Sequence, residues 1–464
     1  MRITFKRSIW PVLLVVGVLL LGLVPTVAGA QESKVPIDTL VVVMQEDRTF
    51  NNYFGTYSSV SPEANGWPEG FQARRDPADP DSELVVPYKL TETRTVSLPH
   101  SEKAMRAAYN EGRMDSFVVA AEEFGAEDGA LAYGYYDGTD IPFYWQLADE
   151  FVLADNWFSS VLGPSFPNHL YLFAGTRYAK TQLDPSTGEP VRYDSAPAEG
   201  MELDTIFDRL EEAGISWKVY IQGYQEDVTY ENAEARAGLH PQASQLIWVP
   251  LVGIPRFVHD PNLNSHLVPL AEYFDDARNG ELPAVSFITP SGLSEHPPGD
   301  LTLGHYFAAD LLEALMLSEH WESSAYVLTW DEWGGFADHV PPPQVDADGY
   351  GLRVPGLIVS PFAKRGYVDH TLYDHTSVLA TIEDWWDLEP LAPRDANANT
   401  FTAAFDFTQE PRPPLVLSTV YDQAPPEVDP AQQSATVKSA YALMMIAVGA
   451  STALALVVAR RRST

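Results

Sequence analysis

The chain has 464 residues, no cysteine and a formal net charge of −35 at pH 7. Its 22 tyrosines, 21 phenylalanines and 11 tryptophans exclude an intrinsically disordered chain, and the lack of cysteine excludes a disulfide-stabilised scaffold. The negative charge disfavours nucleic acid or anionic lipid as a non-specific partner, and it is equally compatible with a saline habitat.

Residues 1–30 have the pattern of a secretory signal peptide. A positively charged start precedes the apolar stretch "PVLLVVGVLLLGLV", and the small residues "AGA" at 28–30 form a cleavage site. The same segment is compatible with an uncleaved membrane anchor. Cleavage would export the rest of the chain.

Strands and helices alternate along the body of the chain. In chain order we expect a strand at 37–47, a helix at 204–214, strands at 216–223 and 282–290, a helix at 305–321, strands at 324–332 and 353–363, and a helix at 377–386. Near-continuous apolar strands between helices are typical of a mostly parallel sheet covered on both faces. The sequence therefore predicts an α/β fold, in one large or two fused domains, with lid-like insertions at 56–100 and 224–280.

Residues 440–459 form an uncharged apolar run, and three arginines follow it. A helix of this length crosses a hydrocarbon core of about 30 Å, and the arginines favour the cytoplasmic side. The first part of the preceding segment, 409–439, is rich in proline and acidic residues, and this composition is typical of a stalk. We therefore expect a single-pass cell-surface protein, with an extracellular body at 32–408 and a cytoplasmic tail at 460–464.

Two acidic pairs follow predicted strands. Glu46 and Asp47 come after the first strand, and Asp331 and Glu332 come after a later one, in "VLTWDEWGGFADHVPPP". Ligands of such sheets bind beyond the carboxyl ends of the strands. The four acids are therefore candidates for a metal site, although a solvated acidic loop has the same composition.

Ser165 lies in "GPSFPN", immediately before an apolar helical run. Pro167 suits the first turn of a helix, and a serine before that turn is typical of an N-cap. A helix start also offers free N–H groups to an anion, so Ser165 is equally placed to meet a phosphate.

Four segments together resemble the phosphoesterase family that includes bacterial phospholipases C and an acid phosphatase, within the alkaline-phosphatase-like superfamily. They are "EDRTFNNYFG", "GPSFPN", "SEHPP" and "DEWGGFADHVPPP", and they occur in the family's order across roughly 38–390. The family's patterns are E-N-R-S-F-D-x-Y-F-G, G-P-T/S-x-P-N, E-H-P-P and D-E/D-x-G-G-x-x-D-H-V-x-P-P. The chain departs from them at Asp47, where the family has Asn, and this adds a negative charge to the site.

The resemblance implies that Glu46, Asp47, Asp331 and Glu332 hold a divalent metal ion beside Ser165. Oxygen ligands suit Ca²⁺, Mg²⁺ or Mn²⁺ better than zinc alone. The resemblance further implies that the Ser165 hydroxyl attacks phosphorus and forms a phosphoserine, which water then hydrolyses.

Histidines are the candidates for polar partners of the phosphoryl group. His100, His296 and His339 are predicted to act there, and one of them would protonate the leaving alcohol. Arg48 and Asn168 are predicted to contact the substrate. For His339, and for its neighbour Asp338, orientation of a metal carboxylate is an equal alternative. A more peripheral location is predicted for three other histidines, His169, His370 and His375.

The implied activity is hydrolysis of a phosphate ester, either a phospholipid or a soluble ester. A sulfatase or phosphonate-type hydrolase of the same superfamily is an alternative, but the sulfatase pattern C/S-x-P-x-R would need Arg where His169 stands. A surface binding protein that keeps the fold without turnover is another, and the retention of Ser165 with both acidic pairs argues against it.

Overall fold

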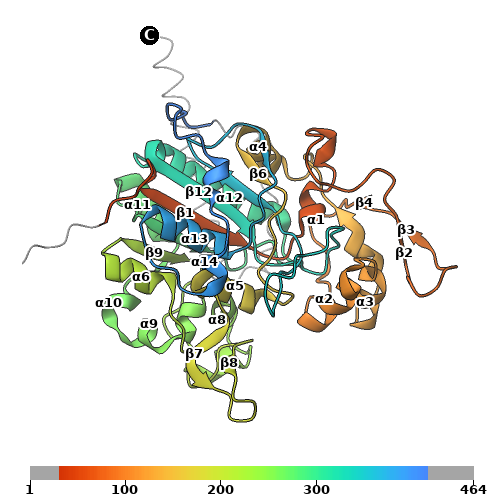
Figure 1. The fold of residues 1–464 in the computed structure, drawn as a ribbon, viewed down its shortest axis with the longest axis horizontal. Helices are drawn as coiled ribbons and strands as arrows, with labels where there is room; N and C mark the ends of the chain where they lie inside the picture. The colour runs from red at the N-terminus through yellow and green to blue at the C-terminus, as the bar shows by residue number, and fades with distance from the viewer. Residues whose placement is uncertain (1–30, 416–464) are drawn as a thin grey trace, which may run out of the picture.

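The computed structural model describes residues 31–415. Its centre is an eight-stranded sheet with helices on either side, in the strand order β10-β9-β11-β1-β12-β13-β6-β14 (Figure 1). Only β13 runs antiparallel to its neighbours, β12 and β6. The predicted fold class, an α/β fold with a mostly parallel sheet between helices, is thereby confirmed. The strands of this sheet are β1 (Thr39–Gln45), β6 (Val152–Ala154), β9 (Trp217–Ile221), β10 (Leu267–Pro269), β11 (Val285–Thr289), β12 (Ser324–Trp330), β13 (Gly356–Val359) and β14 (Tyr367–Asp369).

Two groups of helices cover the sheet. In one group α4 and α11 pack against α12, and in the other α6 and α13 pack against α5. The α-helices are α1 (Phe50–Phe54), α2 (Glu102–Tyr109), α3 (Phe117–Glu123), α4 (Pro142–Glu150), α5 (Ser165–Ala174), α6 (Ile206–Ala213), α7 (Ala233–Arg236), α8 (Gln245–Trp248), α9 (Pro255–His259), α10 (Pro261–Asn264), α11 (Ala271–Asn279), α12 (Leu301–Leu317), α13 (Thr376–Trp385) and α14 (Pro393–Ala396).

The central strands β1 and β12 position the candidate site. Every residue of both strands is buried, which explains their continuous apolar sequences. The strands pair in parallel from Thr39 with Ser324 to Gln45 with Trp330, so they end at the same level. The acids that follow them therefore leave the sheet side by side.

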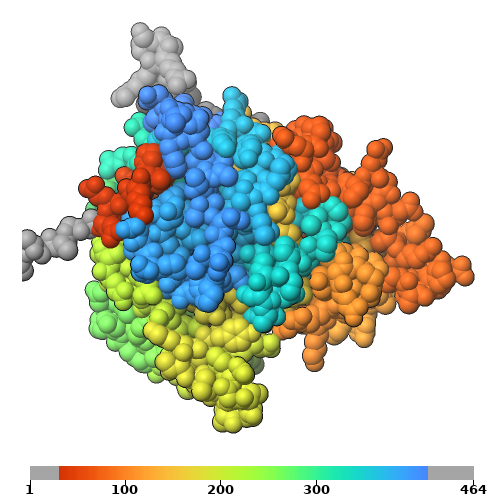
Figure 2. Space-filling view, in the orientation of Figure 1, coloured from red at the N-terminus to blue at the C-terminus, as the bar shows by residue number. Residues whose placement is uncertain are grey.

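Short paired strands lie outside the main sheet. They are β2 (Ala73–Arg74) with β3 (Leu84–Val85), β4 (Tyr88–Lys89) with β5 (Gly134–Tyr135), and β7 (Tyr178–Leu183) with β8 (Pro190–Arg192). Figure 2 shows the first of these regions as an orange lobe on one side of the molecule and the β7–β8 hairpin as a yellow projection below. The predicted insertion at 56–100 belongs to the orange lobe.

The second predicted insertion is more ordered than the sequence indicates. Residues 224–280 contain five α-helices, α7 to α11, a short 3-10 helix at Pro250–Gly253 and the edge strand β10. Each element except α11 has five residues or fewer, which is too short for a helical or strand period to stand out. The long helix predicted at 305–321 also begins earlier, because the Asp300 side chain accepts from the Thr302 N–H at 3.0 Å and caps it.

The single-pass membrane location predicted above is corrected here. Within residues 31–415 no helix is long and apolar enough to cross a membrane. The segments on which the prediction depended, 1–30 and 440–459, lie outside the described residues, as do most of the proposed stalk and the whole tail.

Candidate active site

Two acidic pairs meet where β1 and β12 end. Asp331 Oδ1 accepts from the backbone N–H groups of Asp47 at 2.9 Å and of Glu332 at 2.8 Å. Asp47 has a positive φ of 65°, which turns the chain sharply after Glu46. Gly334 has a φ of 59°, and a Cβ at this position would lie 2.5 Å from the Asp47 carbonyl oxygen. Only glycine fits there, so the first glycine of "WGG" brings the two acidic loops into contact.

The four acids are buried with most of their charge uncompensated. We call Glu46, Asp47, Asp331 and Glu332 the acid cluster; each is at most 1% exposed. Glu46 Oε2, both Asp47 oxygens, Asp331 Oδ2 and Glu332 Oε1 have no hydrogen-bond partner among the described residues. Burial first, and then the neighbouring carboxylates, raise the pKa of Glu46, Asp331 and Glu332. Orphaned oxygens of this kind are expected where a cation binds.

Ser165 begins α5 beside the acid cluster. Pro164 occupies the N-cap position, so Ser165 is the first helical residue and not the cap. Its hydroxyl interacts with the carboxylates of Glu46 and Asp331 and partly offsets the rise in their pKa. The side chain is therefore directed at the acids rather than at the backbone of its own helix.

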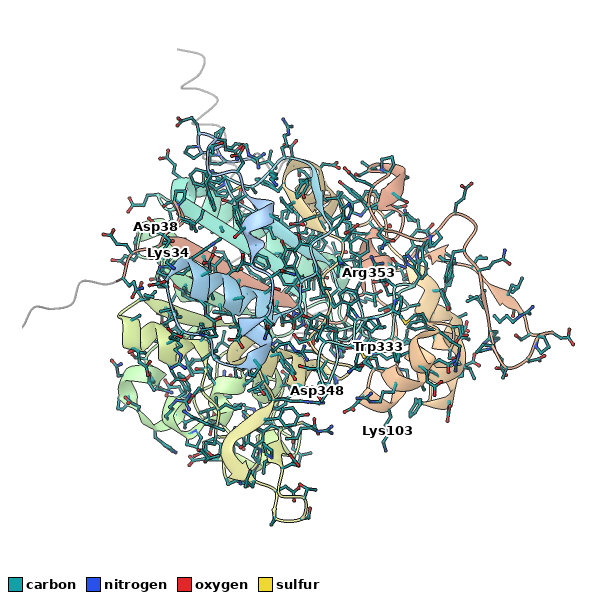
Figure 3. All side chains as sticks on the ribbon, viewed as in Figure 1. Lys34, Asp38, Lys103, Trp333, Asp348 and Arg353 are labelled. Carbon is teal, nitrogen blue, oxygen red and sulfur yellow. The ribbon has the colours of Figure 1, made fainter. Side chains whose placement is uncertain are left out.

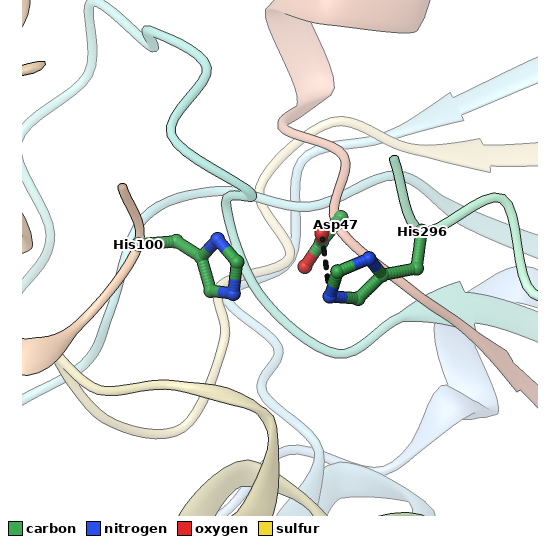
Figure 4. A group of neighbouring side chains, drawn as sticks. All are labelled: Asp47, His100 and His296. Atoms are coloured by element: carbon green, nitrogen blue, oxygen red, sulfur yellow. Dashed lines mark ion pairs between the residues drawn. The ribbon is translucent and has the colours of Figure 1, made fainter. Parts of the chain in front are cut away.

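His100 and His296 approach Asp47 from two different loops (Figure 4). His296 Nε2 lies 3.3 Å from Asp47 Oδ2, and the centroids of the two imidazole rings are 5.4 Å apart. One ring nitrogen of each histidine and one Asp47 oxygen all lie within 4.8 Å of one another. Burial opposes ionisation of Asp47, but the two histidines, Glu332 and Arg48 outweigh it and lower the pKa of Asp47. We call Asp47, His100 and His296 the His–Asp group.

A cavity of about 790 Å³ opens over these residues. Its volume is in the range of small-molecule sites. Ser165, His100 and His296 line it together with residues from 235–248 of the second insertion. The apolar side chains of the lining include Phe166, Ala235, Leu246, Ile247 and Trp248, and Arg236 adds a cation.

Arg48 and Asn168, the two predicted substrate contacts, lie beneath the site. Arg48 Nη1 donates to the Asp47 carbonyl at 2.9 Å and Nη2 to the Glu295 carbonyl at 2.6 Å. Asn168 Nδ2 donates to the Pro164 carbonyl at 3.1 Å. Both side chains are at most 1% exposed. The geometry makes them supports of the site's backbone, and contact with substrate stays a prediction.

His339 is separated from the acid cluster. Its Nδ1 lies 2.7 Å from Asn51 Nδ2, and its ring packs against Trp67. Burial lowers the pKa of His339. Asp338 forms a fully buried ion pair with Arg353, whose Nε lies 3.0 Å from Asp338 Oδ1; Figure 3 labels Arg353. Both residues brace the loop that follows the second acidic pair, and a catalytic role of His339 has no geometric support here.

Two histidines that the sequence places at the periphery contact the acid cluster. His169 Nε2 lies 2.9 Å from Glu46 Oε1, and burial lowers the pKa of His169 to about 3. His375 Nε2 lies 2.8 Å from the Asp331 carbonyl oxygen, while its Nδ1 accepts from Trp157 at 3.4 Å. The prediction for these two was wrong. His370, by contrast, pairs with Asp155 and has a half-exposed ring, as expected of a peripheral residue.

Glu295 is a further residue whose role the sequence does not reveal. It is 2% exposed, and its carboxylate accepts from Tyr53 at 2.6 Å, Tyr144 at 2.5 Å and Trp330 at 3.0 Å. These partners come from α1, α4 and the end of β12. Glu295 therefore fixes the loop that carries His296. The only signal for it in the sequence was an acid next to a motif histidine.

The acid cluster, Ser165 and the two histidines lie together at the carboxyl edge of the sheet, beside the cavity. Residues 37–389 match the model of the Phosphoesterase family, and the chain belongs to this family. It is therefore a hydrolase that acts on phosphoric ester bonds.

Named relatives agree with this assignment. The chain is 30% identical to phospholipase C B of Mycobacterium tuberculosis over 424 residues, which span 81% of this chain and 79% of that protein. Phospholipase C A of the same organism is 31% identical over 427 residues, with 81% and 78% covered. Non-specific phospholipase C3 of Arabidopsis thaliana is 26% identical over 424 residues, with 82% and 76% covered.

Solved structures overlap only loosely. A protein of the alkaline phosphatase superfamily from Vibrio parahaemolyticus covers 82% of this chain and 74% of its own, with 11% identity and a TM-score of 0.37. The PsFucS1 sulfatase from Pseudoalteromonas sp. has the same coverage, 11% identity and a TM-score of 0.38.

Proposed function

We propose that the chain is a metal-dependent phosphoesterase of the phospholipase C or acid phosphatase type that works through a phosphoserine at Ser165. The observation that supports this most directly is the position of the Ser165 hydroxyl. It lies at a helix start, against two buried carboxylates, on the wall of a cavity that also exposes two histidines.

The acid cluster fits a divalent cation. Its orphaned oxygens come from four carboxylates and, among the described residues, have no hydrogen-bond donor. Glu46, Asp47, Asp331 and Glu332 would hold the ion, and oxygen ligation favours Ca²⁺, Mg²⁺ or Mn²⁺. A bound cation would neutralise the acids, lower the pKa of the Ser165 hydroxyl and polarise a phosphoryl oxygen.

The chain's own residues would then perform two displacements. Ser165 Oγ forms a bond to phosphorus as the bond from phosphorus to the ester oxygen breaks, and the departing alcohol takes up a proton. Water next attacks phosphorus, the Oγ–P bond breaks, and the serine hydroxyl is restored. The free N–H groups at the start of α5 would favour the anionic phosphoryl group on Ser165. His100 and His296 are proposed to act on the phosphoryl group or the leaving alcohol from the cavity wall.

A lipid substrate is favoured over a soluble ester by two observations. The cavity that Ser165 lines also carries Leu246, Ile247 and Trp248, which suit the apolar part of an ester. The named relatives are phospholipases C, and we propose the same substrate class for this chain. Turnover of phospholipid in detergent micelles, compared with a soluble phosphomonoester, separates the two substrate classes.

The mechanism is tested at Ser165. We expect Ser165→Ala to abolish turnover while the fold and bound metal persist, because the side chain reaches the acids without forming part of the core. Wild-type protein quenched in acid during turnover of a ³²P-labelled substrate should carry phosphate on the peptide that contains Ser165. Ser186→Ala, in the exposed β7–β8 hairpin, is the matched control and should keep full activity. Near-normal activity of Ser165→Ala would overturn the mechanism and leave a binding protein as the better reading.

A further inference from the structure

One arginine of the cavity lining has no acidic partner. Arg236 is the last residue of the short helix α7, and its side chain is half-buried. Its Nη1 donates to the Tyr230 carbonyl at 2.9 Å, and among residues 31–415 its guanidinium forms no ion pair. Because the chain has 64 acidic residues against 29 basic ones, an unpaired cation in this cavity requires an explanation.

The Arg236 guanidinium is held in place before any ligand binds. Asn232 caps α7 by accepting from the Glu234 and Ala235 N–H groups at 3.0 Å and 3.1 Å, and Ala235 is buried. The Tyr230 carbonyl then fixes one nitrogen of the Arg236 side chain. An arginine has several N–H donors in one plane, so most of them remain for a ligand. A planar fork held in this way suits bidentate binding of a carboxylate or phosphate.

The other polar groups of the lining also favour an anion near Arg236. Asp194 is the one acid of the lining, and it is bound by Arg177 Nη1 at 3.0 Å and by Arg192 Nη2 at 2.7 Å, so its charge is compensated. Ser244 makes no side-chain hydrogen bond to the helix α8 that it precedes, which leaves its hydroxyl for a ligand. The net charge of −35 repels anions from the molecule as a whole. An anionic group of a substrate therefore needs a local cation, and Arg236 supplies one.

The second insertion contributes both this cation and an apolar surface to the cavity. Leu246, Ile247 and Trp248 line the same space as Arg236. The phosphoryl group that reacts belongs beside Ser165, which lies on a different element, α5. A second anionic group elsewhere in the ester is therefore the ligand that the chemistry of Arg236 fits.

We propose that Arg236 makes the enzyme selective for phosphate esters that carry a second anionic group, a carboxylate or a further phosphate, besides the phosphoryl group that reacts. The proposal rests on the proposed function, because it names the substrate class of the same site. A phospholipid with an acidic headgroup and a soluble acidic phosphate ester share this chemistry. An ester whose headgroup carries only an ammonium group is disfavoured, because the guanidinium repels that cation.

The test compares pairs of esters that differ by one carboxylate, with the purified full chain in Mg²⁺, Mn²⁺ or Ca²⁺. The lipid pair is dibutyryl phosphatidylserine and dibutyryl phosphatidylethanolamine, used as monomers so that the charge of a lipid surface plays no part. The soluble pair is O-phosphoserine and O-phosphoethanolamine. We expect wild type to favour the serine ester, and the pair that it hydrolyses distinguishes a lipid from a soluble substrate. In Arg236→Ala the ratio of kcat/KM between serine and ethanolamine ester should fall about 10- to 100-fold, the range for one hydrogen bond to a charged group. In Arg236→Glu the preference should reverse.

The control is Arg278→Ala, which changes an exposed arginine that pairs with Asp275 outside the cavity and should keep the wild-type ratio. Arg236→Lys keeps the charge without the planar fork, so its ratio should lie between those of wild type and Arg236→Ala. The ratio compares two substrates of one preparation, so partial unfolding of a variant does not change it. A wild type without preference, or equal losses on both esters in Arg236→Ala and Arg236→Glu, would overturn the proposal and leave the proposed function standing. Equal losses would assign Arg236 to support of its loop through the Tyr230 carbonyl or to the reacting phosphoryl group. No turnover of either pair by wild type would reject the proposed function itself.

Discussion

Glu295 and His296 are neighbours in one loop but contact different surroundings. The Glu295 carboxylate is enclosed by Tyr53, Tyr144 and Trp330, whereas His296 lines the cavity. Glu295 has a positive φ of 69°, which separates the two side chains in direction. Because three buried donors hold Glu295, the position of the His296 ring is set before substrate binds.

A substitution at His296 distinguishes charge stabilisation from proton donation. If the ring stabilises the charge of the phosphoryl group, His296→Ala should lower kcat about 10²–10³-fold for alkyl and activated aryl phosphates alike. A proton donor matters less for an aryl ester, because that leaving group needs little protonation. Steady-state kinetics on both ester types measure the difference. A loss confined to the alkyl ester would assign His296 to protonation of the leaving alcohol.

Sequence motifs reveal those site residues that lie in short, contiguous stretches of the chain. Ser165 and the two acidic pairs stand in short recognisable stretches, and the structure brings them together. His169 and His375 could not be found in this way. His169 meets Glu46 across 123 positions, and His375 meets Asp331 across 44. Their contacts depend on how α5 and α13 pack on the sheet, and no local pattern encodes that.

The turn after the second acidic pair depends on a glycine. Gly334→Ala would force a side chain into a left-handed conformation and place its Cβ 2.5 Å from the Asp47 carbonyl oxygen. We expect weaker metal binding and a loss of activity on the order of 10²-fold, because a shift of about 1 Å in a reacting geometry has that effect. Metal titration and kinetics measure both.

Gly188→Ala is the control for the change at Gly334. Gly188 has a similar φ of 74°, but a Cβ there meets nothing within 4 Å. It should lower the free energy of unfolding by about 1–2 kcal/mol through backbone strain alone, with unchanged metal binding and activity. Equal behaviour of the two variants would mean that the contact with Asp47 has no role.

The packing of α13 against α14 contains a pair of carboxyl groups that should make stability depend on pH. Burial, and then the charge of Asp395, raise the pKa of Glu383 to about 9. The folded protein therefore holds a proton that the unfolded chain releases above its ordinary pKa of about 4.3. The retained proton stabilises the folded state fully at pH values below about 4.3. This stabilisation is lost as the pH rises from about 4.3 to about 9.

Glu383→Gln tests this assignment, because the amide can donate to Asp395 at every pH. Between pH 5 and pH 9 the Tm of wild type should fall relative to the Tm of Glu383→Gln. The reason is that only the wild-type carboxyl loses its proton in the range between the unfolded and the folded pKa. Thermal melts at several pH values measure it. Asp384→Asn changes an exposed neighbour and should follow the wild-type curve. Parallel curves for Glu383→Gln and wild type would show that the pair does not share a proton.

At the scale of elements, the sequence predicts the long, buried parts best. The strands β1, β9, β11 and β12 and the helix α12 have enough residues for their apolar patterns to stand out. The strands β6, β10 and β14, at or next to the edges of the sheet, have three residues each and were not predicted. Their place in the sheet is set by pairing with distant strands, as between Tyr367 and Val152.

The whole molecule carries 64 acidic and 29 basic side chains, so repulsion between negative charges already destabilises the folded state. The acid cluster adds four carboxylates that are at most 1% exposed. Without a cation, burial and mutual repulsion oppose their ionisation, and the raised pKa values of Glu46, Asp331 and Glu332 reflect that cost. A cation that binds only the folded state should therefore stabilise the entire domain.

Removal of divalent ions should lower activity and Tm together. At a metal concentration about 100-fold above Kd the folded state gains about 2.7 kcal/mol, and a chelator removes this stabilisation. Calorimetry and phosphatase assays with EDTA, followed by readdition of Mg²⁺, Mn²⁺, Ca²⁺ or Zn²⁺, measure both effects and identify the ion. In Asp331→Asn the shift in Tm between chelated and loaded protein should shrink, because one charged ligand is lost. Asp81→Asn, in an exposed loop, should keep the full shift. Full activity of the chelated wild type, or an undiminished shift in Asp331→Asn, would contradict a metal ion in the acid cluster, because the ligands that justify it would then have no effect on either quantity.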